Sequence, residues 1–198
     1  MQTQKDLCLA HPKGGIMNID VLSFGRLAYR VFEEVGQDAR VVLDDEGKNL
    51  VLRKIAGECE KDLKVFKGNL KKQGYISEVK SVLSEFAQYG VDFERLDDFM
   101  KEVPPESYLH YKLDDIRTIY EKFEEYLSEK YITKEEMLDV LSDAVPYSDI
   151  LKGSVVAMDG FTGFTPVQNR LIGELFSVCE KVMITVTMDG RENPYVYE

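Results

Sequence analysis

Ser154-Val-Val-Ala-Met-Asp-Gly-Phe161 is the stretch that decides the fold of this chain. It is a short apolar run that ends on the carboxylate of Asp159. Its length and its β-branched residues are typical of a strand buried on both faces, as in a parallel sheet. Asp159 then falls at the carboxyl end of that strand, which is where open α/β sheets bind their ligands.

The two residues at the end of this run favour a degenerate nucleotide site. In P-loop nucleotidases an Asp in the place of Asp159 helps to hold Mg²⁺, and the next residue, a Glu in many helicases, polarises the attacking water. Here that next residue is Gly160, which has no side chain. We therefore interpret Asp159 as degenerate Walker B-like, in a site that does not hydrolyse ATP by the usual route. The plain alternative is a buried strand that runs into a turn.

The residues after this strand predict a complete α/β unit. Thr165 and Gln168 form a capping box, and Pro166 suits the first turn of the helix that they begin. That helix is predicted to run to about Cys179. Residues 182–187 then have the composition of a second strand.

The N-terminal part predicts one more strand and one more helix. Ile19, Val21 and Leu22 lie in an alternating apolar segment that indicates a strand over residues 18–24. Residues 26–35 have the pattern of a helix that is stopped by Gly36. We expect the two α/β pieces to join into one sheet, since this is the most economical arrangement of such units.

The middle of the chain, from about residue 44 to residue 146, is predicted to be helical almost throughout, with breaks at glycines and at Pro104-Pro105. A capping box at Thr133 and Glu136 begins its last helix. Its clearest element is a stripe of apolar residues at alternating steps of four and three: Leu109, Leu113, Ile116, Tyr120, Phe123 and Leu127. This stripe is typical of a core-facing helix in a bundle, and a coiled-coil seam is the alternative.

Composition excludes several classes of protein. A hydrophobic content of 44% is ordinary for a soluble globular protein. No segment approaches the length of a membrane span, and the N-terminus lacks the apolar core of a signal peptide, so we expect a cytoplasmic protein. Cys8, Cys59 and Cys179 are odd in number and far apart, which argues against a disulfide framework and a zinc site.

The net charge of −11 is concentrated in one region. Residues 81–150 hold eighteen acidic and seven basic side chains, whereas the two ends of the chain are nearly balanced. An acidic surface of this kind repels a phosphate backbone. Any contact with nucleic acid is therefore expected at the two ends.

No complete phosphate-binding loop of the Gly-x-x-x-x-Gly-Lys-Ser/Thr type is present. Pro12-Lys13-Gly14-Gly15 has neither the spacing nor a hydroxyl after the lysine. Residues 193–198 end without an obvious terminating element. We expect the chain to be a fragment of a longer protein.

Three blocks of sequence resemble the AddB subunit family of the bacterial AddAB helicase-nucleases, which is called RexB in some bacteria. They comprise residues 21–32, 112–123 and 158–168, and they occur in the family's order. The resemblance implies an interior piece of the helicase-like N-terminal region of a longer subunit. Residues 1–43 and 151–198 then form an α/β, P-loop-type (superfamily 1 helicase-like) subdomain with a partial parallel sheet and no phosphate loop. Residues 44–150 form a large all-α insertion.

The family's role implies a part in DNA double-strand break repair and homologous recombination. In the family this region resembles a helicase that has lost its motor function and helps to scan single-stranded DNA for the recombination hotspot Chi. The AddA subunit, with which it forms a heterodimer, supplies the motor. The resemblance also implies ATP, Mg²⁺ and an iron-sulfur cluster for the parent protein, while this chain is expected to hold no cofactor, no metal and no catalytic residue.

By resemblance, Phe24, Arg26 and Tyr29 match the family's DNA-contacting motif, and Phe161 or Phe164 matches an aromatic residue on the neighbouring loop. Aromatic rings stack on bases, and an arginine binds phosphate or a base edge. Some relatives have a larger aromatic residue in place of Tyr29. The plain alternatives are that Phe24 is a core ring, that Arg26 is a solvated helix charge, and that the two loop aromatics staple the following helix.

Two other functions compete with this one. In the first, the acidic helical insertion is an interaction module that docks the motor subunit and the α/β part is only a scaffold. In the second, the chain is an independent ATPase. The second is disfavoured, because both the phosphate loop and the catalytic Glu are missing.

Overall fold

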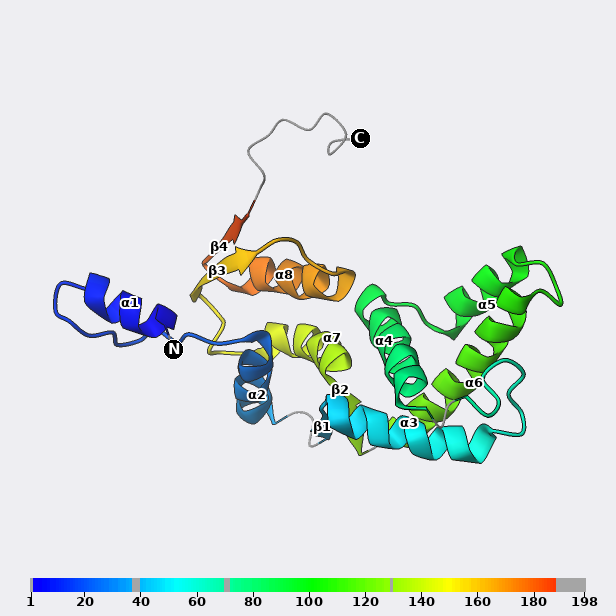
Figure 1. Ribbon diagram of the computed structural model, residues 1–198. Coiled ribbons are helices and arrows are strands. Elements are labelled where there is room, and N and C mark those ends of the chain that lie inside the picture. Colours follow the sequence, from blue (N-terminus) through cyan, green and yellow to red (C-terminus); the bar gives the residue numbers. More distant parts are fainter. Residues whose placement is uncertain (1, 37–39, 70–71, 129, 188–198) are drawn as a thin grey trace.

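The computed structural model describes residues 2–36, 40–69, 72–128 and 130–187, and the chain is an α/β protein that is mostly helical with short parallel strands (Figure 1). Residues 193–198, whose ending the sequence singles out, lie outside the described residues. The helices are α1 (Gln2–Ala10), α2 (Phe24–Val35), α3 (Asp45–Cys59), α4 (Gln73–Tyr89), α5 (Phe93–Glu102), α6 (Tyr108–Leu127), α7 (Lys134–Ala144), the 3-10 turn η1 (Val145–Tyr147) and α8 (Pro166–Val178). The strands are β1 (Val41–Leu43), β2 (Tyr131–Thr133), β3 (Val155–Phe161) and β4 (Lys181–Val186).

The β3–α8–β4 unit confirms the local predictions made from the opening stretch of sequence. β3 and β4 pair in parallel, with Val155 opposite Lys181, and α8 connects them. Thr165 caps α8 through the predicted capping box with Gln168, and Pro166 is the first helical residue. Cys179 is the C-cap, as expected.

The prediction that β3 is buried on both faces is wrong. Met158 is buried, but Val155 is 58% exposed and its neighbours on the same face are also exposed. In the described part of the chain β3 pairs only with β4. A two-stranded sheet buries little surface by itself, so one face of β3 stays in contact with solvent.

The predicted strand over residues 18–24 is also wrong, because the described segment before α2 is irregular. Ser23 starts a helix instead: its side chain accepts a hydrogen bond from the backbone amide of Arg26, and α2 begins at Phe24. Asp20 forms an ion pair of 2.6 Å with Arg30 on that helix. The predicted stop is confirmed, since Gly36 is the C-cap with a positive φ of 68°.

Within the described residues, the two predicted α/β pieces do not join into one sheet, which corrects a further prediction. β1 pairs in parallel with β2, and this sheet is separate from the β3–β4 sheet. β2 lies directly before α7, inside the stretch that the sequence predicts to be helical. β1 is not predicted from the sequence, and three apolar residues in a row, such as Val41 to Leu43, identify neither a strand nor its partner.

A first core, which we call the helical core, joins α3, α4, α5 and α6. The predicted stripe on α6 faces this core, which favours the bundle interpretation over a coiled-coil seam; only Leu109, at the start of the stripe, is exposed. Asp115, on α6, is 1% exposed and accepts hydrogen bonds of 2.7 to 2.8 Å from the backbone amides of Lys64, Val65 and Phe66. This carboxylate fixes the loop after α3 to α6.

A second core, which we call the α/β core, joins α2, α7 and α8 with the inner face of β3. In Figure 1 α7 lies between α8 and α2, at the centre of this group. Its packing depends on Leu141 and Leu171, both fully buried. α7 thus packs into the α/β core although the sequence assigns it to the helical insertion, and the domain boundaries at residues 43/44 and 150/151 stay predictions.

Candidate nucleic-acid interface

The structure brings three of the five predicted DNA-contacting residues together. The rings of Phe24 and Phe161 are 5.7 Å apart between centroids, and those of Phe161 and Phe164 are stacked at 4.9 Å. All three are partly buried and pack against the α/β core. We call these three residues the aromatic cluster. Its members come from the start of α2, the end of β3 and the loop before α8.

Two capped helix starts border the aromatic cluster. Phe24 is the first residue of α2, directly after the Ser23 cap, and Phe164 directly precedes Thr165, the cap of α8. The free backbone amides of a helix N-terminus and the positive end of its dipole favour anions. The site therefore combines apolar rings with the amide groups at the start of α2. At the start of α8, Pro166 has no amide hydrogen, and the capping box already uses the amides of Thr165 and Gln168.

Arg26 and Tyr29 are not part of the aromatic cluster. With about 3.6 residues per turn, they lie on one side of α2 and Phe24 lies on the other. Both are exposed, Tyr29 by 57%. Arg26 makes no ion pair within the described ranges, whereas Arg30, one turn further on, is held by Asp20. Arg26 thus has a charge that is open to a ligand.

Asp159 and Gly160 lie at the end of β3, next to the aromatic cluster. The exposed carboxylate of Asp159 accepts a hydrogen bond from the hydroxyl of Thr185 on β4. Gly160 has a φ of +81°. No group of three or more His, Cys, Asp or Glu side chains that could hold a metal ion is found among residues 2–36, 40–69, 72–128 and 130–187. Asp159 alone does not fit a site for Mg²⁺ and ATP.

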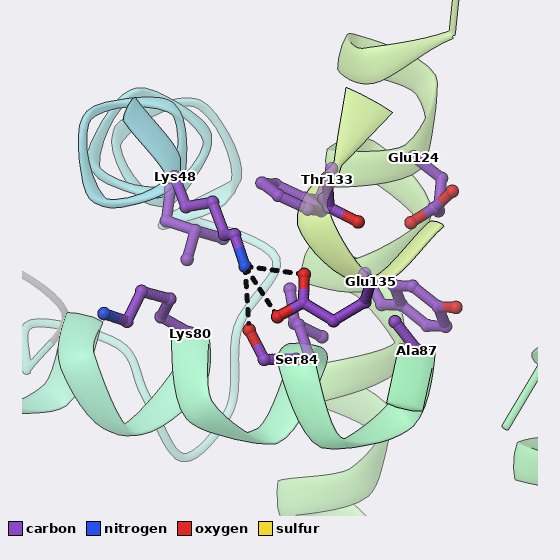
Figure 2. A pocket seen from close by; sticks show the side chains of 11 residues that line it. Lys48, Lys80, Ser84, Ala87, Glu124, Thr133 and Glu135 are labelled. Atoms are coloured by element: carbon purple, nitrogen blue, oxygen red, sulfur yellow. Dashed lines mark hydrogen bonds and ion pairs between the residues drawn. The ribbon is translucent and has the colours of Figure 1, made fainter. Parts of the chain in front are cut away.

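The described residues also contain a small pocket that the sequence does not suggest (Figure 2). Its free volume of about 10 Å³ is enough for roughly one water molecule and excludes a nucleotide. Lys48, which is 2% exposed, crosses the pocket and lies 2.8 Å from Glu135 and 3.1 Å from the hydroxyl of Ser84. This ion pair connects α3 of the helical core to α7 of the α/β core.

Glu124 lines the same pocket and carries the largest electrostatic perturbation of a carboxyl group there. Burial, together with the nearby carboxylate of Glu136 to which it is hydrogen-bonded, raises the pKa of Glu124 to about 7. Glu136 is itself the capping-box partner of Thr133, from which it accepts two hydrogen bonds. A protonated Glu124 can donate a hydrogen bond to the carboxylate of Glu136.

Sequence reasoning missed the residues of this pocket for a simple reason. The capping box at Thr133 and Glu136 could be read from the sequence and is confirmed. Nothing in the sequence, however, indicates that Lys48 lies against Glu135, because 87 residues separate them. A buried lysine looks the same in a sequence as an exposed one.

No helix in the described ranges is long and apolar enough to span a membrane. A family model described as "ADDB, N-terminal" matches residues 1–197. The chain is 47% identical over 192 residues to the B subunit of the ATP-dependent helicase/deoxyribonuclease of Lachnoclostridium phytofermentans, which covers 97% of this chain and 17% of that protein. It is 35% identical over 189 residues to the protein of the same name from Alkaliphilus metalliredigens, covering 96% of this chain and 16% of the relative.

A third relative with this name, from Clostridium acetobutylicum, is 34% identical over 188 residues, which cover 95% of this chain and 16% of the relative. The chain thus spans about a sixth of the length of these relatives. The resemblance that the three sequence blocks indicate is confirmed by these matches. This chain belongs to the AddB N-terminal family.

Proposed function

We propose that this chain is part of the AddB subunit of an ATP-dependent helicase/deoxyribonuclease that acts in the cytoplasm in DNA double-strand break repair and homologous recombination. Within that subunit it serves as a helicase-like region that contacts single-stranded DNA and contributes to recognition of Chi. Membership of the AddB N-terminal family and the shared name of the relatives support this role. The parallel β3–α8–β4 unit is compatible with a superfamily 1 helicase-like origin.

The observation that carries the DNA-binding proposal is the aromatic cluster. Phe24, Phe161 and Phe164 gather between two helix N-termini. Aromatic rings stack on any base, and helix N-termini and an arginine hold the phosphates that link the bases. We propose that a single strand crosses the start of α2, with bases on the rings of the aromatic cluster and with Arg26 and Tyr29 contacting the strand from the other side of the helix.

In this proposal the chain binds DNA and does not hydrolyse ATP. The residue after Asp159 is Gly160, which has no carboxylate to polarise the attacking water. ATP, Mg²⁺ and the iron-sulfur cluster that the family resemblance implies are assigned to other parts of the whole protein and to its AddA partner. This chain's contribution is to position DNA for them.

The test is a fluorescence titration with single-stranded oligonucleotides, using the complete subunit in complex with its partner. Arg26→Ala is expected to weaken binding by about three- to tenfold, because it removes one phosphate or base contact. Arg30→Ala is the matched control, since Arg30 lies on the same helix but is already paired with Asp20.

A second variant addresses the rings. Phe24→Leu keeps an apolar side chain in the core and removes the stacking surface, so we expect a loss of about tenfold in affinity and a weaker response to Chi. Unchanged affinity and unchanged Chi response in both Arg26→Ala and Phe24→Leu would refute the site.

A second function has its own observation. The excess of acidic residues in 81–150 and the exposed Phe99, Tyr108 and Leu109 on α5 and α6 favour an interaction surface for the motor subunit. Reversal of the acidic charges at Glu94, Asp98 and Glu102 is expected to abolish co-purification with the partner if this function holds. If the charge-reversed variant still co-purifies with the motor subunit at both high and low salt, the result argues against this second function.

A further inference from the structure

The end of β3 contains a β-bulge that decides where Phe161 points. Met158 pairs with Ile184 and Phe161 pairs with Val186, so β3 advances three residues while β4 advances two. The pairing continues after the irregularity, because the backbone amide of Thr187 donates to the carbonyl of Phe161 at 2.9 Å. One extra residue is therefore inserted into β3 between Met158 and Phe161.

The extra residue reverses the alternation of side chains along β3. Before the bulge, Val156 and Met158 face the α/β core, while Val155, Ala157 and Asp159 are exposed. In a regular strand successive side chains point to opposite faces, so Phe161 would share the exposed face of Asp159. With the extra residue, Phe161 faces the core and reaches Phe24 and Phe164.

Three residues hold the bulge. Gly160 has a φ of +81°, in the region that side-chain-bearing residues rarely adopt. A Cβ atom at Gly160 would meet nothing within 4 Å, so the backbone conformation, and not lack of space, requires the glycine. On the other strand, the hydroxyl of Thr185 donates to the carboxylate of Asp159 and ties the bulged residues to β4.

We propose that the Asp159–Gly160 bulge is a positioning device that aims Phe161 into the aromatic cluster for stacking on a DNA base. Asp159, Gly160 and Thr185 are its positioning residues, and the inference rests on the proposed DNA-binding function. In this inference Gly160 is required for the bulge. A Glu at this position, as in active helicases, would need either a strained backbone or a strand without the bulge.

The test compares two substitutions at Gly160 in the complete subunit bound to its partner. Gly160→Ala strains the positive φ, whereas Asn tolerates this region better than other side-chain-bearing residues. We expect Gly160→Ala to lower the affinity for a single-stranded oligonucleotide by about tenfold and Gly160→Asn to recover most of that loss. An abasic oligonucleotide of the same length should bind both variants as it binds the wild type, because it offers phosphates but no base to stack.

A double variant separates this role from a general loss of structure. In the background of Phe161→Leu, which removes the stacking ring, Gly160→Ala is expected to have no further effect on affinity. Thr185→Val removes the hydrogen bond to Asp159 without straining the backbone, and it should reduce base-dependent affinity by about two- to threefold. If Gly160→Ala does not fold, the Thr185→Val variant alone tests the positioning role.

The outcomes distinguish this inference from the proposed function. If Phe161→Leu weakens binding but Gly160→Ala and Thr185→Val do not, the positioning role is refuted and the DNA site stands. Equal losses on normal and abasic oligonucleotides, or additive losses in the double variant, also refute it. If Phe161→Leu, Phe24→Leu and Arg26→Ala all leave binding unchanged, both the site and the device fail.

Discussion

The helical core and the β3–β4 sheet differ in how far their residues are exposed to solvent. The helical core buries an aspartate, Asp115, and satisfies it with three backbone amides. The β3–β4 sheet beside the α/β core leaves Val155 and Met183 exposed, and the partly buried rings of the aromatic cluster lie at one end of it. The closed region therefore supplies stability, and the open region supplies the surface on which we place the function.

The largest expected effect on stability comes from a substitution inside the helical core. Asp115→Ala leaves three backbone amides, of which that of Phe66 is buried, without their acceptor, and we expect it to lower the free energy of unfolding by about 3 to 5 kcal/mol. The measurement is chemical unfolding of the purified chain, followed by circular dichroism. Hydrogen exchange should show the loss in α3 and α6 and much less in α8.

Asp114→Ala is the matched control for this prediction. Asp114 is the neighbouring residue, and its ion pair of 2.8 Å with Lys64 is solvent-exposed, so we expect a change below about 0.5 kcal/mol. Equal effects of the two variants, or equal loss of protection in α8, contradict the view that Asp115 stabilises the helical core specifically.

Local sequence signals predicted α2, the helices of the middle region and β3–α8–β4 well, but they did not predict α1. The capping boxes at Thr133 and Thr165 identify helix starts because both partners lie within four residues of each other. The stripe on α6 gave the buried face directly, because a helix turns its side chains with a fixed period.

The errors arise where the outcome depends on residues far apart in the sequence. Ile19, Val21 and Leu22 alternate like a strand, but Ser23 begins a helix and no described strand pairs with them. Likewise, the sequence places Phe24 and Phe161 in one site by family resemblance, while the bulge that brings their rings together depends on the backbone of Gly160. A register shift of one residue cannot be read from a composition pattern.

The second prediction concerns the connection between the two cores. Lys48→Met leaves the carboxylate of Glu135 partly buried beside Ser84 without its cation, and we expect a loss of about 2 to 3 kcal/mol in the free energy of unfolding. The double variant Lys48→Met/Glu135→Gln should regain more than half of this loss, since no uncompensated charge remains. The measurement is chemical unfolding at pH 7.

Lys54→Met serves as the control, because its ion pair with Glu58 is exposed on the same helix. If Lys48→Met and Lys54→Met have the same small effect, the ion pair does not couple the two cores. If the double variant is as unstable as the single one, the loss comes from packing of the lysine stem and not from charge.

The smallest expected effect on the free energy of unfolding concerns Glu124, and it depends on pH. The pKa of Glu124 is raised from the ordinary 4.5 to about 7 in the folded protein, so the folded state keeps its proton when the unfolded state has lost it. The stabilisation from this group is therefore complete below about pH 4.5 and is lost as the pH rises through about 7. Glu124→Gln mimics the protonated carboxyl, because its amide can donate to Glu136 at every pH.

We therefore expect Glu124→Gln to match the wild type at pH 4.5 and to be more stable by about 2 kcal/mol at pH 8, measured by chemical unfolding at both values. Glu125→Gln is the control on the same helix, because Glu125 is exposed. If the two variants have the same pH dependence, the buried carboxyl pair does not exist in solution. If only Glu124→Gln reduces the pH dependence of the free energy of unfolding, the ionised carboxylate of Glu124 destabilises the region between the two cores at high pH. Asp115, inside the helical core, differs because three backbone amides donate hydrogen bonds to its carboxylate.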